Sequence, residues 1–449
     1  MTAPPQDPPV WRNTAFVRLW IAQAITQTAM NAIWYALLVI VEEASHSRTQ
    51  LGITILSVIV PSVLFGVPAG AYVDRWDKRK VLVVTNLARA VAVAGYIVFS
   101  PTLPLLYAVS FVFSIISQFF APAETAVIPS IVGRGRLMQA TSFFHLTFTA
   151  SQLAGLVFFG PLLVKLLGPE WPTPFFLTMA ALYLISGGLV WRLPQDAEPP
   201  VKSGHVNPVA ELFRQLREVA QLLSKDQEMV SAMAYWTLGA TLTLIVAMLA
   251  PGYVVQILGI AAADAVLVLA PAGVGMLTAA FVLSRATTGL FADRRRTITN
   301  GLVLVSLSLA MTAALPALGR LVGLLRPEWH EIELVGEPQA ALIGGVMLMA
   351  LFAGCGFAAI MVASQTLLQE RAPERARGRI FAVQFTLGNL ASIVPLLAAG
   401  GLADLIDART GGSGITYVML LMAAAVMAAA WFSRQRGPRV PMAEPTSGR

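Results

Sequence analysis

Long apolar stretches, separated by short polar turns, make up most of the chain. A helix that crosses a bilayer needs about 20 mostly apolar residues, because the hydrocarbon layer is about 30 Å thick. The pattern therefore predicts an all-α integral membrane protein with twelve transmembrane helices. Stretches of sufficient length place these helices near 14–41, 51–73, 81–100, 104–127, 139–167, 172–192, 229–257, 264–288, 297–320, 339–367, 379–403 and 413–433.

The segment 194–228 interrupts this pattern. It opens with Pro194 and the pair Pro199 and Pro200, after which apolar residues such as Leu212 and Leu216 recur at helical spacing among basic ones. Such a pattern is typical of a linker followed by an amphipathic helix on the membrane surface. The predicted organisation is a cytoplasmic tail at 1–13, a six-helix bundle at 14–193, a cytoplasmic linker at 194–228, a second six-helix bundle at 229–433 and a cytoplasmic tail at 434–449.

Composition and charge agree with a membrane location. The chain is 56% hydrophobic and only 12% charged, whereas soluble proteins carry roughly 25% charged residues. The net charge of +7 does not indicate a nucleic-acid partner, because the basic residues lie in turns between apolar stretches. Their distribution predicts a multi-pass membrane protein with both termini in the cytoplasm. The basic residues expected on the outer side are Arg48, Lys165, Arg320, Arg326 and Arg409.

A short charged phrase follows an apolar stretch in each half of the chain. Residues 70–75 read G-A-Y-V-D-R, and residues 289–294 read G-L-F-A-D-R. A repeat at corresponding points indicates duplicated halves related by a pseudo-two-fold axis, an arrangement typical of transporters. The glycine would let another helix approach closely, and the aspartate could bind the N-terminus of a helix. Contacts of this kind can latch one conformation against another.

This arrangement resembles the major facilitator superfamily, whose loop between helices 2 and 3 carries G-x-x-x-D-R-x-x-[RK]-[RK]. The resemblance implies a conformational gate in which Asp74 meets the start of helix 11, near Arg377 and Arg379. It also makes Glu124 the expected partner of Lys78. The alternative is that the charges only set the topology, but two copies at matching positions favour a gate. The residues that match the motif are Gly70, Asp74, Arg75, Lys78 and Arg79, and its second copy is matched by Gly289, Asp293 and Arg294.

Two further segments resemble one branch of that family. Residues 119–132 read F-F-A-P-A-E-T-A-V-I-P-S-I-V, and residues 365–381 read Q-T-L-L-Q-E-R-A-P-E-R-A-R-G-R-I-F. Both are similar to segments of bacterial drug and siderophore exporters, such as the macrolide efflux proteins and the enterobactin exporter. The resemblance implies export of a small amphipathic molecule by alternating access across a bacterial plasma or inner membrane, and it leaves the identity of the cargo open.

Polar residues inside the predicted helices are candidates for lining a substrate cavity. Gln23, Gln27 and Asn31 follow one another along one face of the first helix, and Trp34 lies close to that face. Amides facing lipid would be costly, so this face should contact protein or water. The alternative role of such amides is hydrogen bonding between helices. The further candidates are His145, Gln152, Trp236, Gln384 and Asn389.

The predicted function is secondary active transport rather than catalysis. No G-x-x-x-x-G-K-[ST] phosphate loop occurs, and no nucleophile–base cluster or metal-ligand spacing is present, so we expect neither an ATP-driven pump nor an enzyme, and no cofactor or metal. Proton coupling rests on the resemblance alone, because Thr28–Asn31 and Thr85–Arg89 contain no acid. The expected partners are a small-molecule substrate and the lipid bilayer, with a monomeric protein. The alternative function is a lysophospholipid flippase on the same fold.

Overall fold

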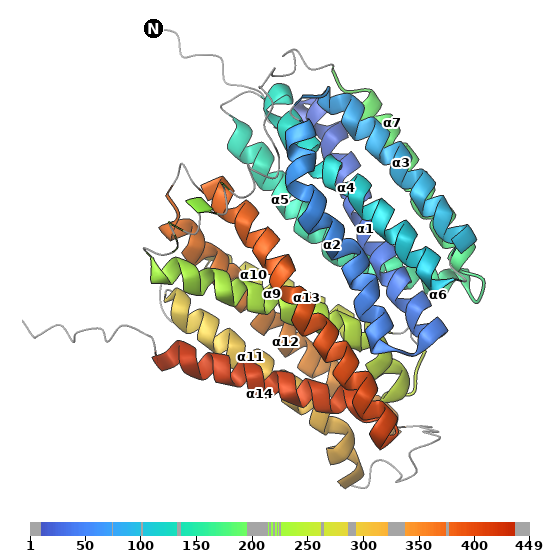
Figure 1. Cartoon of the computed structure of the whole chain (residues 1–449), viewed down its shortest axis with the longest axis vertical. Helices are drawn as coiled ribbons and strands as arrows, with labels where there is room; N and C mark the ends of the chain where they lie inside the picture. Colours follow the sequence, from blue (N-terminus) through green and yellow to red (C-terminus); the bar gives the residue numbers. More distant parts are fainter. Residues whose placement is uncertain are drawn as a thin grey trace, which may run out of the picture.

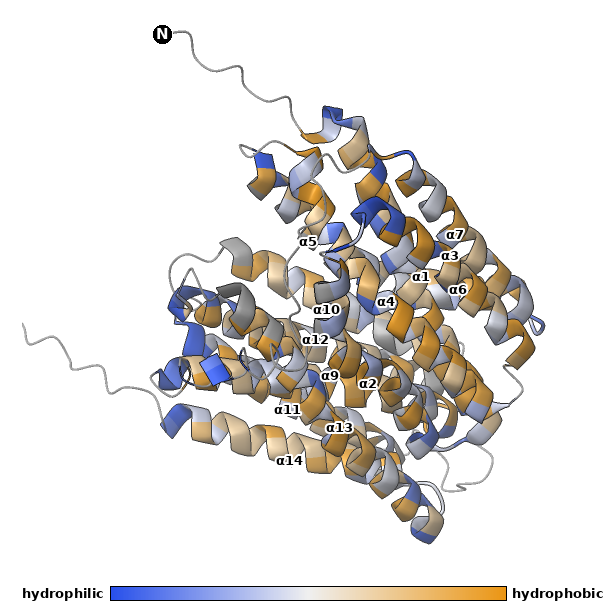
Figure 2. Ribbon diagram, turned by 45° about the horizontal axis from the view of Figure 1, so that its top comes forward, coloured by the Kyte–Doolittle hydropathy of each residue, from blue (hydrophilic) through white to orange (hydrophobic). Residues whose placement is uncertain are grey.

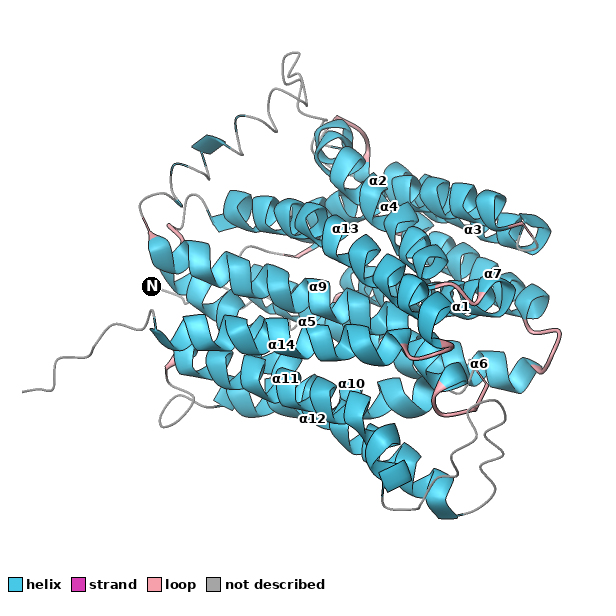
Figure 3. Ribbon diagram, turned by 60° about the horizontal axis from the view of Figure 1, so that its bottom comes forward, coloured by secondary structure: helices cyan, strands magenta, loops and turns pink. Residues whose placement is uncertain are grey.

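The residues described by the computed structural model are almost all in helices, and no strand occurs among them. Figure 1 shows the helices gathered into two bundles, the first coloured blue to green and the second green to red. Figure 3 shows the described connections between consecutive helices as short loops, in pink. The described residues are 10–73, 75–99, 102–132, 136–194, 214, 217–218, 221, 223, 226–261, 265–285, 293–321, 337–373 and 377–435.

Each bundle is made from consecutive helices of one half of the chain. The N-terminal bundle follows a short 3-10 turn at Val10–Arg12 and contains α1 (Thr14–Ser45), α2 (Arg48–Val73), α3 (Lys78–Phe99), α4 (Leu103–Ile131), α5 (Leu137–Leu153), the π-helical segment η3 (Ala154–Phe159), α6 (Gly160–Leu167) and α7 (Pro172–Trp191). The C-terminal bundle contains α9 (Gln227–Gln256), α10 (Val266–Arg285), α11 (Arg294–Leu321), α12 (Glu337–Arg371), α13 (Arg377–Thr410) and α14 (Gly414–Gln435).

Every predicted span lies on one of these helices, with α5, η3 and α6 together forming the predicted span 139–167. Among the described residues, 11 helical segments are long and apolar enough to cross a membrane. The apolar part of α10, Ala270–Leu283, is shorter. The predicted all-α membrane fold is therefore confirmed.

The predicted linker at 194–228 lies mostly outside the described residues, so its boundaries stay a prediction. Arg214, Arg217 with Glu218, Gln221 and Leu223 have helical backbone. Leu223 also packs against the buried apolar cluster that spans both bundles. The tails at 1–9 and 436–449 are outside the described residues.

Local interactions and backbone conformation fix both ends of α1. The Asn13 side chain accepts hydrogen bonds from the backbone of Ala15 and Phe16 at 3.0 and 3.2 Å, which satisfies N–H groups that α1 itself leaves without partners. At the other end of α1, His46 adopts a left-handed conformation with φ of 48°. This conformation ends the helix and turns the chain directly into α2.

The two bundles meet at one end of the molecule. We call the end that carries Thr14 and Gln435 the terminal end, and the end that carries the turn at His46 and Ser47 the distal end. In Figure 1 the ribbons of α2 and α13 converge at the distal end and diverge toward the terminal end.

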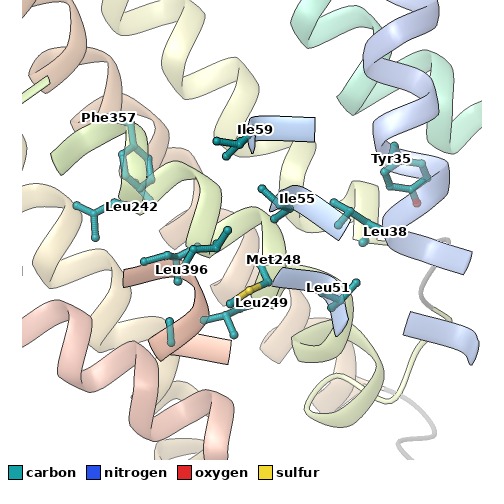
Figure 4. Packing of buried hydrophobic residues seen from close by; sticks show 14 of the residues in the cluster. Tyr35, Leu38, Leu51, Ile55, Ile59, Leu242, Met248, Leu249, Phe357 and Leu396 are labelled. Atoms are coloured by element: carbon teal, nitrogen blue, oxygen red, sulfur yellow. The ribbon is translucent and has the colours of Figure 1, made fainter. Parts of the chain in front are cut away.

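Contacts between the bundles run along α2 from the distal end, and we call this line of contacts the distal seam. An added Cβ at Gly52 would lie 3.4 Å from the Met248 sulfur of α9. Farther along, the Asn389 amide of α13 donates to the Ser62 hydroxyl of α2 at 3.2 Å. Figure 4 shows the apolar packing in this region, with Leu51 and Ile55 of α2 near Met248, Leu249 and Leu396.

The core is divided in a way that matches this arrangement. One buried cluster spans both bundles and includes the distal seam. A second cluster, around Phe16, Leu82 and Phe120, lies within the N-terminal bundle near the terminal end. Large apolar residues also cover the outside of the bundles, as Figure 2 shows in orange, and Val91 and Val394 are both 73% exposed. Such a surface suits contact with lipid, because hydrocarbon does not penalise it.

Candidate functional site

The first charged turn lies at the terminal end, between α2 and α3. Gly70 is half-buried in the last turn of α2, and no described atom lies within 4 Å of an added Cβ, so no described helix approaches it closely in this conformation. Asp74 lies outside the described residues. Arg75 and Lys78 are half-buried and each makes interactions. The predicted meeting of Asp74 with helix 11 therefore stays a prediction.

The start of α3 is fixed within the N-terminal bundle. The Asp77 side chain accepts a hydrogen bond from the Lys80 backbone at 3.2 Å. The Arg79 guanidinium donates to the Trp191 carbonyl and lies 5.3 Å from the centre of the Trp191 ring. A cation at the C-terminal end of α7 is favourable, because the last carbonyl groups of a helix lack partners. Arg79 thus joins the ends of α3 and α7.

The second charged turn forms an ion-pair network inside the C-terminal bundle. Asp293 caps α11 by accepting from the backbone of Arg295 and Arg296 at 3.0 and 3.3 Å. Arg294 lies 3.4 Å from Glu370 of α12. Arg295 lies 2.8 Å from Glu228 of α9, which also pairs with Arg371 of α12.

This network joins the terminal ends of α9, α11 and α12. The repeated phrase in the sequence predicts only two of its members, Asp293 and Arg294. Gly289 lies outside the described residues. Arg377 and Arg379 have backbone in the first turn of α13, and their side chains lie outside the description.

Glu124 is buried inside the N-terminal bundle, with an exposed fraction of 4%. Its Oε1 has no hydrogen-bond partner among the described residues. The positive charge that acts on it belongs to Arg89 of α3. Arg89 is itself buried, donates to the Ser117 hydroxyl at 3.1 Å, and lies 4.4 Å from the centre of the Phe120 ring. Arg89 is absent from the basic residues expected on the outer side, so the charge pattern alone groups it with the cytoplasmic cations, whereas the fold places it inside the bundle with Glu124.

The amides of α1 make different contacts. The Gln23 amide donates to the Phe144 carbonyl of α5 at 3.4 Å, which fits the alternative role of hydrogen bonding between helices. The Asn31 amide donates to the Gln27 carbonyl of its own helix at 2.7 Å. The Gln27 side-chain oxygen is buried and has no partner among the described residues. Trp34 is half-buried against the core.

The remaining cavity candidates divide between the bundles. Gln384 is buried and donates to Gln365 of α12 at 3.3 Å. Trp236 of α9 packs against Gly388 of α13, where an added Cβ would lie 2.8 Å from the indole ring. Asn389 lies on the distal seam, Gln152 is exposed, and the side chain of His145 is outside the description.

At the distal end the sequence predicts only the side of the membrane on which Arg48 lies, and it assigns no contact to Arg48, Glu42 or Asp404. Arg48 and Glu42 are each 1% exposed, and their nearest nitrogen and oxygen atoms lie 3.8 Å apart. Arg48 also donates to the His46 carbonyl. Asp404 of the opposite bundle accepts hydrogen bonds from the first residues of α2. The sequence does not predict the contact between Arg48 and Asp404, because the two residues lie 356 positions apart at the ends of separate apolar stretches.

The arrangement of two helical bundles has a counterpart among known proteins. Residues 19–396 match the family model of the Major Facilitator Superfamily. The chain belongs to this family. Its members and the relatives of this chain are transporters and not enzymes. The predicted family and the predicted fold of two six-helix bundles are thereby confirmed, and this facilitator is a multi-pass membrane protein.

The relatives of this facilitator include exporters at low identity. Enterobactin exporter EntS of Escherichia coli O1:K1 / APEC is 24% identical over 440 residues, which cover 95% of each chain. Macrolide efflux protein A of Streptococcus pyogenes is 28% identical over 132 residues, which cover 28% of this facilitator and 33% of that protein.

A similar fold occurs in a bacterial homologue of the human lysosomal transporter Spinster, in an inward-facing and occupied conformation. The TM-score is 0.69 at 12% identity, with 95% of this facilitator and 96% of that chain covered. At this identity the likeness concerns the fold alone. Within the described part of the chain, no group of three or more His, Cys, Asp or Glu side chains could hold a metal ion.

Proposed function

We propose that this facilitator exports small amphipathic molecules across a bacterial cell membrane by alternating access, with both termini in the cytoplasm. The observation that carries the proposal is the similarity to the enterobactin exporter along 95% of both chains. The partial similarity to a macrolide efflux protein agrees with an apolar cargo. In this orientation the distal seam closes the outer side, and the conformation is inward-facing.

Glu124 is our candidate for the residue that couples export to proton movement. Burying an ionised carboxylate with an oxygen that accepts no hydrogen bond, as Oε1 of Glu124 is buried, is costly. A group placed in this way favours exchange of a proton during the cycle. The buried Arg89 beside it supplies a charge that Glu124 can neutralise when it is ionised. Both residues belong to helices of one bundle, so a change in their packing can accompany the motion of that bundle.

The test is transport by everted membrane vesicles that contain the full chain and carry an acid-inside proton gradient. The probes are a macrolide, a catecholate siderophore, a lipophilic cationic dye and a lysophospholipid. We expect gradient-driven uptake of at least one of the first three, and we expect Glu124→Gln to abolish this uptake while leaving exchange of labelled for unlabelled probe intact. Glu370→Gln is the matched control, because Glu370 is half exposed in a surface ion pair, and it should retain gradient-driven uptake.

The other outcomes contradict parts of the proposal. Uptake of the lysophospholipid alone would assign the alternative function of a flippase. Equal loss of exchange and of gradient-driven uptake in Glu124→Gln would remove Glu124 from the coupling step. Uptake of none of the probes by vesicles that contain folded protein would argue against export of this class of cargo.

A further inference from the structure

Asp404 of α13 caps a helix that belongs to the other half of the molecule. Its Oδ1 accepts from the Arg48 backbone at 2.8 Å, and its Oδ2 accepts from the Thr49 backbone at 2.9 Å and from the Ser47 hydroxyl at 2.7 Å. The first N–H groups of a helix have no partner inside the helix, and a carboxylate there also meets the positive end of the helix dipole. The start of α2 is therefore satisfied from across the distal seam.

Arg48 and two glycines bring the bundles into close contact at the same place. An added Cβ at Gly252 of α9 would lie 2.7 Å from the Arg48 guanidinium. An added Cβ at Gly400 of α13 would lie 2.8 Å from the Arg48 carbonyl oxygen. The start of α2 is thus held between α9 and α13, and only residues without a side chain leave room for it. Figure 1 shows α2 and α13 converging here.

The chain also carries a second cap for α2, from its own sequence. Ser47 precedes the helix and Gln50 is its third residue, which is the spacing of a capping box. The Gln50 backbone donates to the Ser47 hydroxyl oxygen at 3.4 Å, which is long for a hydrogen bond. The Ser47 proton is donated to Asp404, and the Gln50 side chain accepts from Tyr107 at 2.8 Å. The local cap is present but only weakly engaged while Asp404 is in place.

We propose that Asp404 and the start of α2 form a latch that holds the distal end closed, and that the Ser47–Gln50 cap replaces Asp404 when the latch opens. Asp404 acts as a positioning residue for the transport cycle, because it fixes one bundle against the other and touches no cargo. The exchange of caps keeps the N–H groups of α2 bonded in both states, which reduces the free-energy difference between them. The inference rests on the alternating-access cycle of the proposed function.

The test measures the separation of the two bundles by electron paramagnetic resonance on the full chain. Spin labels are attached at Thr102→Cys and Thr410→Cys, two exposed positions at the distal end of opposite bundles, after Cys355→Ser removes the native cysteine. We expect a short separation in this background. Asp404→Asn should raise the ratio of long to short separations about fivefold, because it removes the negative charge at the N-terminus of α2 and one of the two acceptor oxygens. Asp404→Glu, which keeps the carboxylate, should recover part of the short population.

A pair of neighbouring glycines provides a steric test that leaves Asp404 in place. Gly400→Ala inserts a methyl group against the backbone of α2 and should favour the long separation. Gly401→Ala is the matched control, because an added Cβ there meets nothing within 4 Å, and it should keep the short separation. Separations that match the background in both Asp404→Asn and Gly400→Ala would overturn the latch.

The exchange of caps has a test of its own. In an Asp404→Ala background, where residue 404 offers Ser47 no acceptor, Ser47→Ala removes only the local cap and should lower the long population relative to Asp404→Ala alone. An unchanged population would overturn the exchange. The separations are measured without cargo, so they are independent of the vesicle assay. Opening of the distal end in the variants without transport by the vesicles would contradict the proposed function and leave the latch intact. Transport by the vesicles without a change of separation in the variants would contradict the latch and leave the proposed function intact.

Discussion

At the scale of single residues, glycines decide how closely the helices of this facilitator approach each other. An added Cβ at Gly155, in the π-helical segment η3, would contact the Thr28 carbonyl of α1 and lie 2.8 Å from Asn31 Cβ. An added Cβ at Gly188 of α7 would meet nothing within 4 Å. The same substitution therefore tests two opposite environments in one bundle.

We expect Gly155→Ala to lower the free energy of unfolding by about 1–3 kcal/mol, because the methyl group has to push apart backbone that is already in contact. Gly188→Ala should be neutral or raise the free energy by up to about 1 kcal/mol, since alanine is the better helix former. The measurement is thermal unfolding of both purified variants in the same detergent. A lower midpoint for Gly188→Ala than for Gly155→Ala would contradict the packing described for α1 and η3.

The sequence predicts residues of the charged turns better than those of the distal end. Asp293 and Arg294 stand in a repeated phrase, so their importance can be inferred without a fold. Arg48 and Asp404 stand in no motif, and their relation exists only because α2 and α13 converge. In the same way, the charge pattern groups Arg89 with the cytoplasmic cations, and only the fold shows that it is buried within the N-terminal bundle.

At the scale of helices, the terminal ends of α9, α11 and α12 are joined by charge. Glu228 of α9 is 23% exposed and pairs with both Arg295 and Arg371. Glu370 of α12 is 51% exposed and pairs with Arg294. A carboxylate that is shared by two cations should contribute more to holding the helices together than one that is half exposed with a single partner.

We expect Glu228→Gln to lower the thermal unfolding midpoint more than Glu370→Gln, because it leaves two arginines close together without their anion. The free-energy effect should be at most about 1 kcal/mol for each pair, since surface ion pairs contribute little. Raising the salt concentration should reduce the difference between the variants, as screening weakens exposed pairs. A Glu370→Gln midpoint below that of Glu228→Gln at low salt would count against the network.

The positions of the helices could be predicted because length and apolarity suffice to place a span in a bilayer. The internal form of a helix could not be predicted in the same way. The span 139–167 reads as one apolar stretch, yet the structure contains α5, a π-helical segment and α6 within it. Hydrophobicity does not report on a local change in hydrogen-bond pattern, because the same apolar residues can face protein or lipid in either form.

At the scale of the whole molecule, α2 and α13 have an aspartate at opposite ends. Asp404 lies near the distal end of α13 and caps α2. Asp74 follows α2 at the terminal end, and the resemblance to other facilitators implies that it meets the start of α13. If both the Asp404 contact and the Asp74 contact form, they form in different conformations. When the bundles rock against each other, α2 and α13 approach at one end and separate at the other.

We therefore expect the separations at the two ends to change in opposite directions. Spin labels at Lys80→Cys and Arg434→Cys, exposed positions at the terminal end, should move closer together in Gly400→Ala than in Gly401→Ala. The distal labels should move apart in the same variant. A variant that opens the distal end without shortening the terminal separation would show that the bundles do not move as rigid bodies.

The capping of α2 by Asp404 has a consequence for how the molecule could be divided. The contact between the halves consists of backbone N–H groups at the start of α2 in one bundle and the Asp404 carboxylate in the other. Two polypeptides that each contain one bundle would therefore retain complementary surfaces at the distal end. In the proposed exchange of caps, Ser47 caps α2 while the second half is absent. The start of α2 would then be formed before the two halves meet, and reassembly of a split transporter would begin there.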